Sequence, residues 1–157
     1  MDKIPITSIG FEKLEEELKI LKSVERPTVI KSIAEAREHG DLSENAEYHA
    51  AKEKQSFIEG RIADLQNKIS RAEVIITKKL KSNKVIFGAT VTLAEVGKKK
   101  KLVYQIVGTE EADVVNGKIS ISSPLARALL GKKVDDSVEV YSPGGSKEYE
   151  VENIEFL

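Results

Sequence analysis

Four carboxylates are concentrated in the stretch 38–47 of this 157-residue sequence, namely Glu38, Asp41, Glu44 and Glu47. Hard divalent cations such as Mg²⁺ bind one or two carboxylates and fill their remaining positions with water and phosphate oxygens. Two acids therefore make a complete metal site only when another macromolecule supplies the other ligands. We predict this shared metal chemistry for Asp41 and Glu44.

The spacing of Asp41 and Glu44 also has a purely structural explanation. An acid followed three residues later by Glu is a capping-box pattern, and carboxylates in the first turn of a helix complement the helix dipole. Spacing alone favours this explanation if a helix begins near Ser43. Against it, the Ser43 hydroxyl could cap that helix, which would leave Asp41 outside it with no structural role. The residues alone leave both explanations open.

Self-sufficient catalysis has little support in the sequence. His39 and His49 lie ten residues apart, and neither is paired with an acid at the spacing of a zinc-protease motif. Histidines of this kind more often lie at the surface or in packing contacts than in metal sites. The sequence has no Ser/His/Asp arrangement and no glycine-rich phosphate loop. We therefore expect a protein that is not an enzyme and has no cofactor or metal of its own.

Four basic residues near the acidic stretch are candidates for contact with a phosphate backbone: Arg37, Lys52, Lys54 and Arg61. On a helix pair they would form a strip along one side, behind the acids. The common explanation of such charges is a solvated face with pairs at i and i+4. Contact with nucleic acid is the functional alternative. The lysine run 98–101 most often marks a charged hairpin turn.

The acidic stretch lies between two helical patterns. The first begins at Thr7-Ser8, where a hydroxyl can cap the helix, and places Leu14, Leu18, Leu21, Ile30 and Ile33 on one apolar seam. Pro27 removes a backbone donor, so we expect a kink at 23–26 or a second helical segment that opens at Pro27. Gly40 is suited to end the helix after about Glu38.

The second pattern is an a/d heptad seam formed by Ile58, Ile62, Leu65, Ile69, Ala72 and Ile76. Two amphipathic helices joined by a few residues must run antiparallel and cover each other's seams. From Glu44 to Ile76, at a rise of ~1.5 Å per residue, the hairpin would be on the order of 50 Å long. We expect a projecting coiled-coil arm over residues 1–79, with 38–47 at its exposed end.

Residues 80–157 change to short β-branched runs, at 85–93, 102–107, 118–121, 138–141 and 148–156. One short helix is expected over 123–131, with Ser123 as its cap, Pro124 in its first position and Gly131 at its end. This half is predicted to be a small twisted antiparallel sheet with the helix on one face. The fold class is therefore α+β, in two domains.

Composition narrows the class without naming a function. With 40% hydrophobic and 32% charged residues the chain is typical of a globular protein, and its net charge of −1 speaks neither for nor against nucleic acid. Cysteine is absent, no signal-peptide pattern opens the chain, and no apolar run approaches the ~20 residues of a membrane span. These features lead us to expect a cytoplasmic protein.

The run 33–51, IAEAREHGDLSENAEYHAA, closely resembles the tip motif of the bacterial transcript-cleavage factors of the GreA/GreB family. Three further segments agree with that family: 85–91 (VIFGATV), 122–132 (SSPLARALLGK) and 143–145 (PGG). The resemblance covers the whole chain, and its tip motif is specific.

The resemblance implies a transcription elongation factor that binds bacterial RNA polymerase. An FKBP-like C-terminal domain would dock at the rim of the secondary channel, and the coiled coil would enter the channel. Asp41 and Glu44 would then help to hold a second Mg²⁺ and a water in the polymerase active centre, where the backtracked 3′ end of the nascent RNA is hydrolysed. Arg37 and Lys52 would face that RNA. We further expect a monomer, and allow for a weak contact with DNA.

Two other functions fit parts of the pattern. One is a channel-binding inhibitor of RNA polymerase on the same scaffold, although inhibitory relatives differ at the tip, whereas Asp41 and Glu44 are both present here. The other is a prolyl isomerase, suggested by the FKBP-like fold. That activity requires an apolar pocket lined with aromatic rings, and a shared fold does not carry a shared activity.

Overall fold

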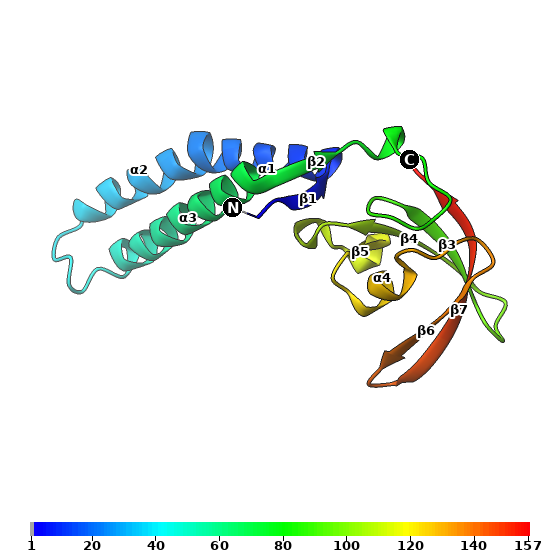
Figure 1. The fold of residues 1–157 in the computed structure, drawn as a ribbon. Coiled ribbons are helices and arrows are strands. Elements are labelled where there is room, and N and C mark those ends of the chain that lie inside the picture. Colours follow the sequence, from blue (N-terminus) through cyan, green and yellow to red (C-terminus); the bar gives the residue numbers. More distant parts are fainter. Residues whose placement is uncertain (1) are drawn as a thin grey trace. The chain divides into compact units, whose positions relative to one another are not determined.

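A computed structural model describes residues 2–157 and divides the chain into two compact units (Figure 1). The helical unit contains Phe11–Ala72, and the sheet unit contains Lys3–Gly10 together with Glu73–Leu157. The predicted boundary at 79/80 lies a few residues further along the chain than Glu73. A helical hairpin and a curled sheet confirm the predicted α+β class. No helix within residues 2–157 combines the length and apolarity that a membrane span requires.

The first arm of the hairpin, from Ser8 to Arg37, is helical throughout, but its helical pitch changes along its length. Helix α1 (Ser8–Ile20) is followed by a π-helical segment (Leu21–Glu25) and by α2 (Arg26–Arg37), which has Pro27 in its first turn. Proline cannot donate to the preceding turn and its ring crowds the carbonyl four residues earlier, so a wider turn just before it relieves the clash. The irregularity expected at Pro27 is confirmed, as a second helical segment that opens there.

The π-helical segment also shifts the apolar seam. Val29 is buried whereas Ile30, which the sequence pattern placed in the core, is 52% exposed, so that prediction was wrong. A π turn contains one extra residue, which rotates every later side chain around the helix. The buried positions of α2 are Val29, Ile33 and Ala36, so the prediction for Ile33 is confirmed while Val29 takes the place expected for Ile30.

Helix α3 (Ala46–Arg71) packs antiparallel against α2 and completes the hairpin. Its buried side chains are Ala51, Ile58, Ile62 and Leu65, the last of which is fully buried. Ion pairs flank this core: Arg26 Nε lies 2.7 Å from Glu59 Oε1, and Arg61 Nε lies 2.5 Å from Glu17 Oε2. The predicted coiled-coil hairpin is confirmed, with α3 ~39 Å long from its 26 residues.

The helical pattern does not continue to Ile76. Helix α3 ends at Arg71, and β2 (Ala72–Ile75) pairs instead with β1 (Ile4–Thr7) in a two-stranded sheet. The run Val74-Ile75-Ile76 is β-branched and favours extended backbone once a partner strand is present. The pairing partner comes from the other end of the chain, which is why heptad spacing alone extended the helix too far.

The second sheet has five strands in the order β5-β4-β3-β7-β6. Their bounds are β3 (Thr90–Glu95), β4 (Lys101–Val107), β5 (Lys118–Ser120), β6 (Ser137–Ser142) and β7 (Gly145–Glu155). The sheet is not wholly antiparallel as expected, because β4 and β5 run parallel. The segment 108–117 between them, which contains two short 3₁₀ turns, is long enough to return the chain to the starting end.

Helix α4 (Pro124–Leu129) is the short helix predicted in this half. The Ser123 hydroxyl accepts a hydrogen bond from Ala126 N at 3.3 Å, and Gly131 follows with a φ of +84°. Ala126 and Leu129 are fully buried in the core of the sheet unit, with Leu93, Ile106 and Val151 among their neighbours. The predicted capping and the predicted glycine stop are both confirmed.

Candidate functional site at the hairpin tip

The tip loop, residues 38–45, joins α2 to α3. Helix α2 ends at Arg37, and the amide of His39 donates to the carbonyl of Ala36 at 3.1 Å. Gly40 follows with a φ of +109°, in the left-handed region that glycine adopts without steric cost. The chain therefore turns away from the helix at Gly40, as predicted, and presents the next residues at the end of the hairpin.

Asp41 is held by Ser43. One carboxylate oxygen of Asp41, Oδ1, accepts hydrogen bonds from the Ser43 amide at 2.9 Å and from the Ser43 hydroxyl at 2.8 Å. These two bonds lower the pKa of Asp41 because they stabilise its ionised form. The expectation that Asp41 has no structural role was therefore wrong, because Asp41 closes a turn with Ser43. Its other oxygen, Oδ2, has no hydrogen bond within residues 2–157.

Asn45, and not Ser43, caps α3. Its side-chain oxygen accepts from the amide of Tyr48 at 3.0 Å, and the helix begins at Ala46. Asp41 is thus not a capping residue, and Glu44 lies before the helix rather than in its first turn. The capping-box explanation of the two acids is therefore wrong. Sequence reasoning missed Asn45, although Asn is among the strongest capping residues.

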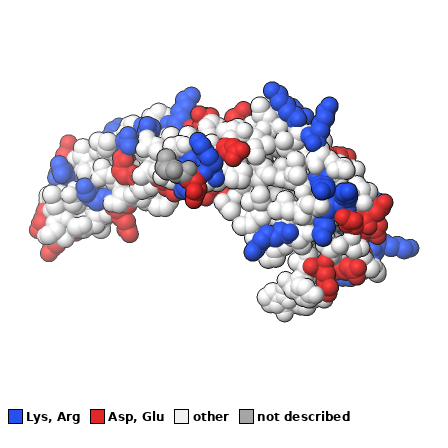
Figure 2. Space-filling model, in the orientation of Figure 1, with Lys and Arg blue, Asp and Glu red and all other residues white. Residues whose placement is uncertain are grey.

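Glu44 is exposed, and within residues 2–157 its carboxylate makes no hydrogen bond or ion pair. Together with Asp41 it lines a shallow hollow of about 510 Å³, whose other lining residues are His39, Asn45, Ala46 and Glu47. Acidic side chains gather at this end of the hairpin, at the left of Figure 2, with basic ones behind them. The structure thus brings the two predicted acids to one solvent-facing hollow.

The two histidines do not form a metal site with these acids. His39 Nε2 lies 3.9 Å from Glu47 Oε2, and His49 Nε2 donates to the carbonyl of Ser43 at 3.2 Å. Within residues 2–157, no three His, Cys, Asp or Glu side chains are grouped so that they could hold an ion. Asp41 and Glu44 are exposed residues with hard carboxylate oxygens, so their chemistry suits Mg²⁺ as part of a larger ligand set.

Arg37 and Lys52 lie on the hairpin behind the acids and line one groove of about 260 Å³ with Ile30, Ile33, Ala34 and Gln55. The Arg37 guanidinium carbon is 6.0 Å from the centre of the Tyr48 ring, and Lys52 Nζ donates to Gln55 Oε1 at 3.2 Å. The structure brings these two cations together. Arg61, the fourth candidate, is instead paired with Glu17 and Asp64.

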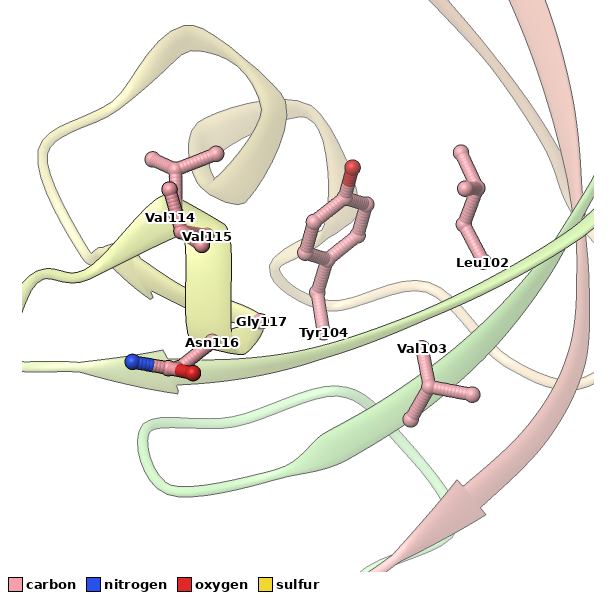
Figure 3. Close-up of a pocket in the computed structure, with 7 residues that line it drawn as sticks. All are labelled: Leu102, Val103, Tyr104, Val114, Val115, Asn116 and Gly117. Atoms are coloured by element: carbon pink, nitrogen blue, oxygen red, sulfur yellow. The ribbon is translucent and has the colours of Figure 1, made fainter.

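A second hollow, of about 430 Å³, lies in the sheet unit between β4 and a 3₁₀ turn (Figure 3). Its lining residues are Leu102, Val103, Tyr104, Val114, Val115, Asn116 and Gly117, of which Tyr104 is aromatic. Figure 3 shows that Val103 and Tyr104 leave the strand on opposite sides, so these two side chains do not form one common wall. It does not resemble the aromatic pocket that a prolyl isomerase requires.

Comparisons with known proteins agree with the resemblance seen in the sequence. Residues 4–74 match the family model for the N-terminal domain of transcription elongation factors, and residues 80–156 match the model for the C-terminal domain of GreA/GreB. A transcription elongation factor GreA from Beijerinckia indica is 60% identical, with 99% of each chain covered. Another from Rhodospirillum rubrum is 59% identical, again with 99% of each chain covered.

Among solved structures, Gfh1 of Thermus aquaticus is 29% identical over 99% of each chain, with a TM-score of 0.45. The family models together cover nearly the whole described chain, and the relatives exceed half identity along its full length. The chain therefore belongs to the GreA/GreB family of transcription elongation factors.

Proposed function

We propose that this protein binds bacterial RNA polymerase, inserts its helical hairpin into the secondary channel and stimulates cleavage of the backtracked 3′ end of the nascent RNA. The observation that carries the proposal is the pair Asp41 and Glu44, exposed in one hollow at the end of a long hairpin. The proposal is that the protein is a cofactor, and that the hydrolytic activity belongs to the polymerase.

The state of the two acids supports a ligand role. The hydrogen bonds from Ser43 lower the pKa of Asp41, which favours its ionised form. These bonds fix Oδ1 and leave Oδ2 accessible, while Glu44 is committed to no partner within residues 2–157. Two carboxylates in this state can be offered to a cation that the polymerase and the RNA phosphates coordinate in part.

The role of the tip acids is to orient ligands at the reacting phosphate. An Mg²⁺ ion held in part by Asp41 and Glu44 would supply an activated water and charge stabilisation at the leaving oxygen. Asp41 is held through Oδ1 by Ser43, and its other oxygen, Oδ2, would be its ligand atom. Glu44 adds a second negative charge, which favours retention of the cation. Neither residue needs to form a covalent bond with RNA in this role.

The basic groove supports RNA contact next to these acids. Arg37 and Lys52 lie on α2 and α3, and both line the groove directly behind the tip loop. Cations in this position attract RNA phosphates without reading sequence. The apolar floor formed by Ile30 and Ile33 could accommodate the face of a displaced base. We propose that the extruded RNA passes along this groove, and that the sheet unit docks at the channel rim.

A cleavage assay on backtracked complexes with purified polymerase tests the proposal. Asp41→Ala and Glu44→Ala should each lower cleavage stimulation on the order of a hundredfold, with polymerase binding nearly unchanged. Glu44→Ala is the cleaner of the two, because Asp41→Ala also removes both bonds from Ser43. Glu47→Ala is the matched control, since Glu47 lines the same hollow.

The assay also distinguishes the competing function. If both tip variants cleaved at the wild-type rate, the metal role would be excluded. If the wild-type protein slowed elongation on backtracked complexes and produced no cleavage, the chain would be a channel-binding inhibitor on the same scaffold.

A further inference from the structure

We infer that Asn45 is a positioning residue for the tip acids, and that its side-chain amide fixes the tip loop to both helices at once. The inference rests on the proposed function, because it assigns Asn45 a role in presenting Asp41 and Glu44. Its basis is independent of the acids, since it comes from the hydrogen bonds at the base of the loop.

The Asn45 amide connects the two helices of the hairpin. Its Nδ2 donates to the carbonyl of Ala36 at 2.6 Å, in the last turn of α2, while its Oδ1 accepts from the amide of Tyr48 at 3.0 Å, in the first turn of α3. Ala36 is buried and Asn45 is half-buried, so this bond is partly shielded from solvent at the base of the loop. A single side chain thus joins the end of one helix to the start of the next.

Capping alone does not require asparagine. Asp, Ser and Asn cap helices with similar strength, and each needs only an oxygen that accepts from the helix. The hydrogen bond to the Ala36 carbonyl also requires a donor on the same side chain, as far from the backbone as the Nδ2 atom of asparagine. Asp has no donor when it is ionised, and Ser has one shorter hydroxyl. The structure therefore uses a property of Asn45 that the other capping residues lack.

The position of Glu44 depends on this connection. The backbone of Asn45 is extended, with φ −86° and ψ 99°, and its backbone N–H donates a hydrogen bond to the carbonyl of Leu42 at 3.4 Å. Glu44 directly precedes it in the chain, and Asp41 lies in the turn that Ser43 closes. Without the bond to Ala36, the Asn45 end of the loop would be joined to α2 only through the chain 38–44, and the separation of the two acids from α2 would be less fixed.

Two substitutions separate positioning from capping. Asn45→Asp and Asn45→Ser both keep a cap for α3 and remove the amide donor. Asp also adds a charge at the tip, which Ser does not, so agreement between the two excludes an effect of that charge. Asn67→Ser is the control, because it removes an exposed amide from the same helix far from the loop.

The measurement is RNA cleavage as a function of Mg²⁺ concentration. Misplaced acids bind the cation more weakly, so both Asn45 variants should need about fivefold more Mg²⁺ for half-maximal cleavage. The maximal rate should recover at high Mg²⁺, and the half-saturating concentration of the factor should stay unchanged. A role in stability alone would not shift the Mg²⁺ requirement at a temperature well below melting, where both variants are folded, although the loss of the hydrogen bond to Ala36 should lower the melting temperature slightly.

Hydrogen exchange in the free protein gives a readout without polymerase. Amides of the tip loop should exchange faster in Asn45→Ser, and those in the middle of α3 should not. Unchanged Mg²⁺ dependence together with unchanged loop exchange, while Glu44→Ala abolished cleavage, would overturn the role of Asn45 and leave the proposed function intact. If Glu44→Ala itself cleaved normally, the proposed function and the role of Asn45 would both fail.

Discussion

The shaft of the hairpin (α2 and α3) and its tip loop obey opposite rules. The shaft buries apolar side chains such as Val29, Ile62 and Leu65, each at most 3% exposed. The tip loop buries almost nothing and is organised by a few hydrogen bonds of Asp41 and Asn45. Apolar burial supplies most of the stability of a helix pair, whereas an exposed polar loop can change with little effect on folding. Stability and function should therefore be separable by mutation in this molecule.

The largest change in stability is expected for a substitution in the shaft, Leu65→Ala. Leu65→Ala removes a fully buried side chain from the hairpin core, so the free energy of unfolding should fall by about 2–5 kcal/mol. Chemical denaturation followed by circular dichroism measures this change. Below the melting temperature of the variant, cleavage stimulation at saturating factor should stay near the wild-type level.

Phe57→Ala is the matched control for that substitution. Phe57 lies on the same helix but is 73% exposed, so its removal should change stability by less than about 0.5 kcal/mol. Equal losses for the two variants would show that the shaft is not stabilised by its buried seam.

Substitutions in the basic groove should have a smaller effect, and this effect should be on RNA cleavage and not on stability. Arg37→Ala and Lys52→Ala should each weaken cleavage stimulation several-fold at low salt, and the difference from wild type should shrink as salt rises. Lys54 is an exposed cation on α3, the helix of Lys52, but it does not line the groove, so Lys54→Ala should have less effect. A salt-independent defect would indicate that these residues act by packing rather than by contact with phosphates.

Loss of the Glu17–Arg61 ion pair should have the smallest effect, and this effect should be on the free energy of unfolding and not on cleavage. The hydrogen bond from Arg61 lowers the pKa of Glu17, so the pair stabilises the fold fully above the ordinary carboxyl pKa of about 4.5 and loses that contribution as pH falls through the lowered value. Both side chains are partly exposed, so the effect should stay below about 1 kcal/mol.

Unfolding titrations between pH 6 and pH 3 measure that effect. Wild type should lose slightly more stability over this range than Glu17→Gln, which cannot titrate at residue 17. If the two proteins lost the same amount, the ion pair would contribute nothing measurable.

The comparison also explains which predictions from the sequence succeeded. The hairpin could be predicted because burial follows the repeating positions Ile58, Ile62 and Leu65 within a single helix. The seam of α2 was predicted only at Ile33, because the π-helical segment before Pro27 adds a residue and places Val29 in the core instead of Ile30. The end of α3 was also missed, because β2 is selected by pairing with β1, far away in the sequence.

At the tip, the sequence predicted which acids would be exposed but not how they are held. Asp41, Ser43 and Asn45 are all good capping residues within five positions, and local propensity does not distinguish them. Asn45 takes that role here and also reaches the carbonyl of Ala36 on the other helix. That contact belongs to the tertiary structure, which a local pattern cannot reveal.

The most direct test of the account is the cleavage rate of Glu44→Gln, in which an amide of nearly the same size replaces the carboxylate. Because the Glu44 side chain makes no hydrogen bond or ion pair within residues 2–157, the melting temperature and polymerase binding of the variant should match those of the wild type. Cleavage of backtracked RNA should fall on the order of a hundredfold, while Glu47→Gln stays near wild type. Wild-type cleavage by Glu44→Gln would contradict the central claim that the tip supplies a metal ligand.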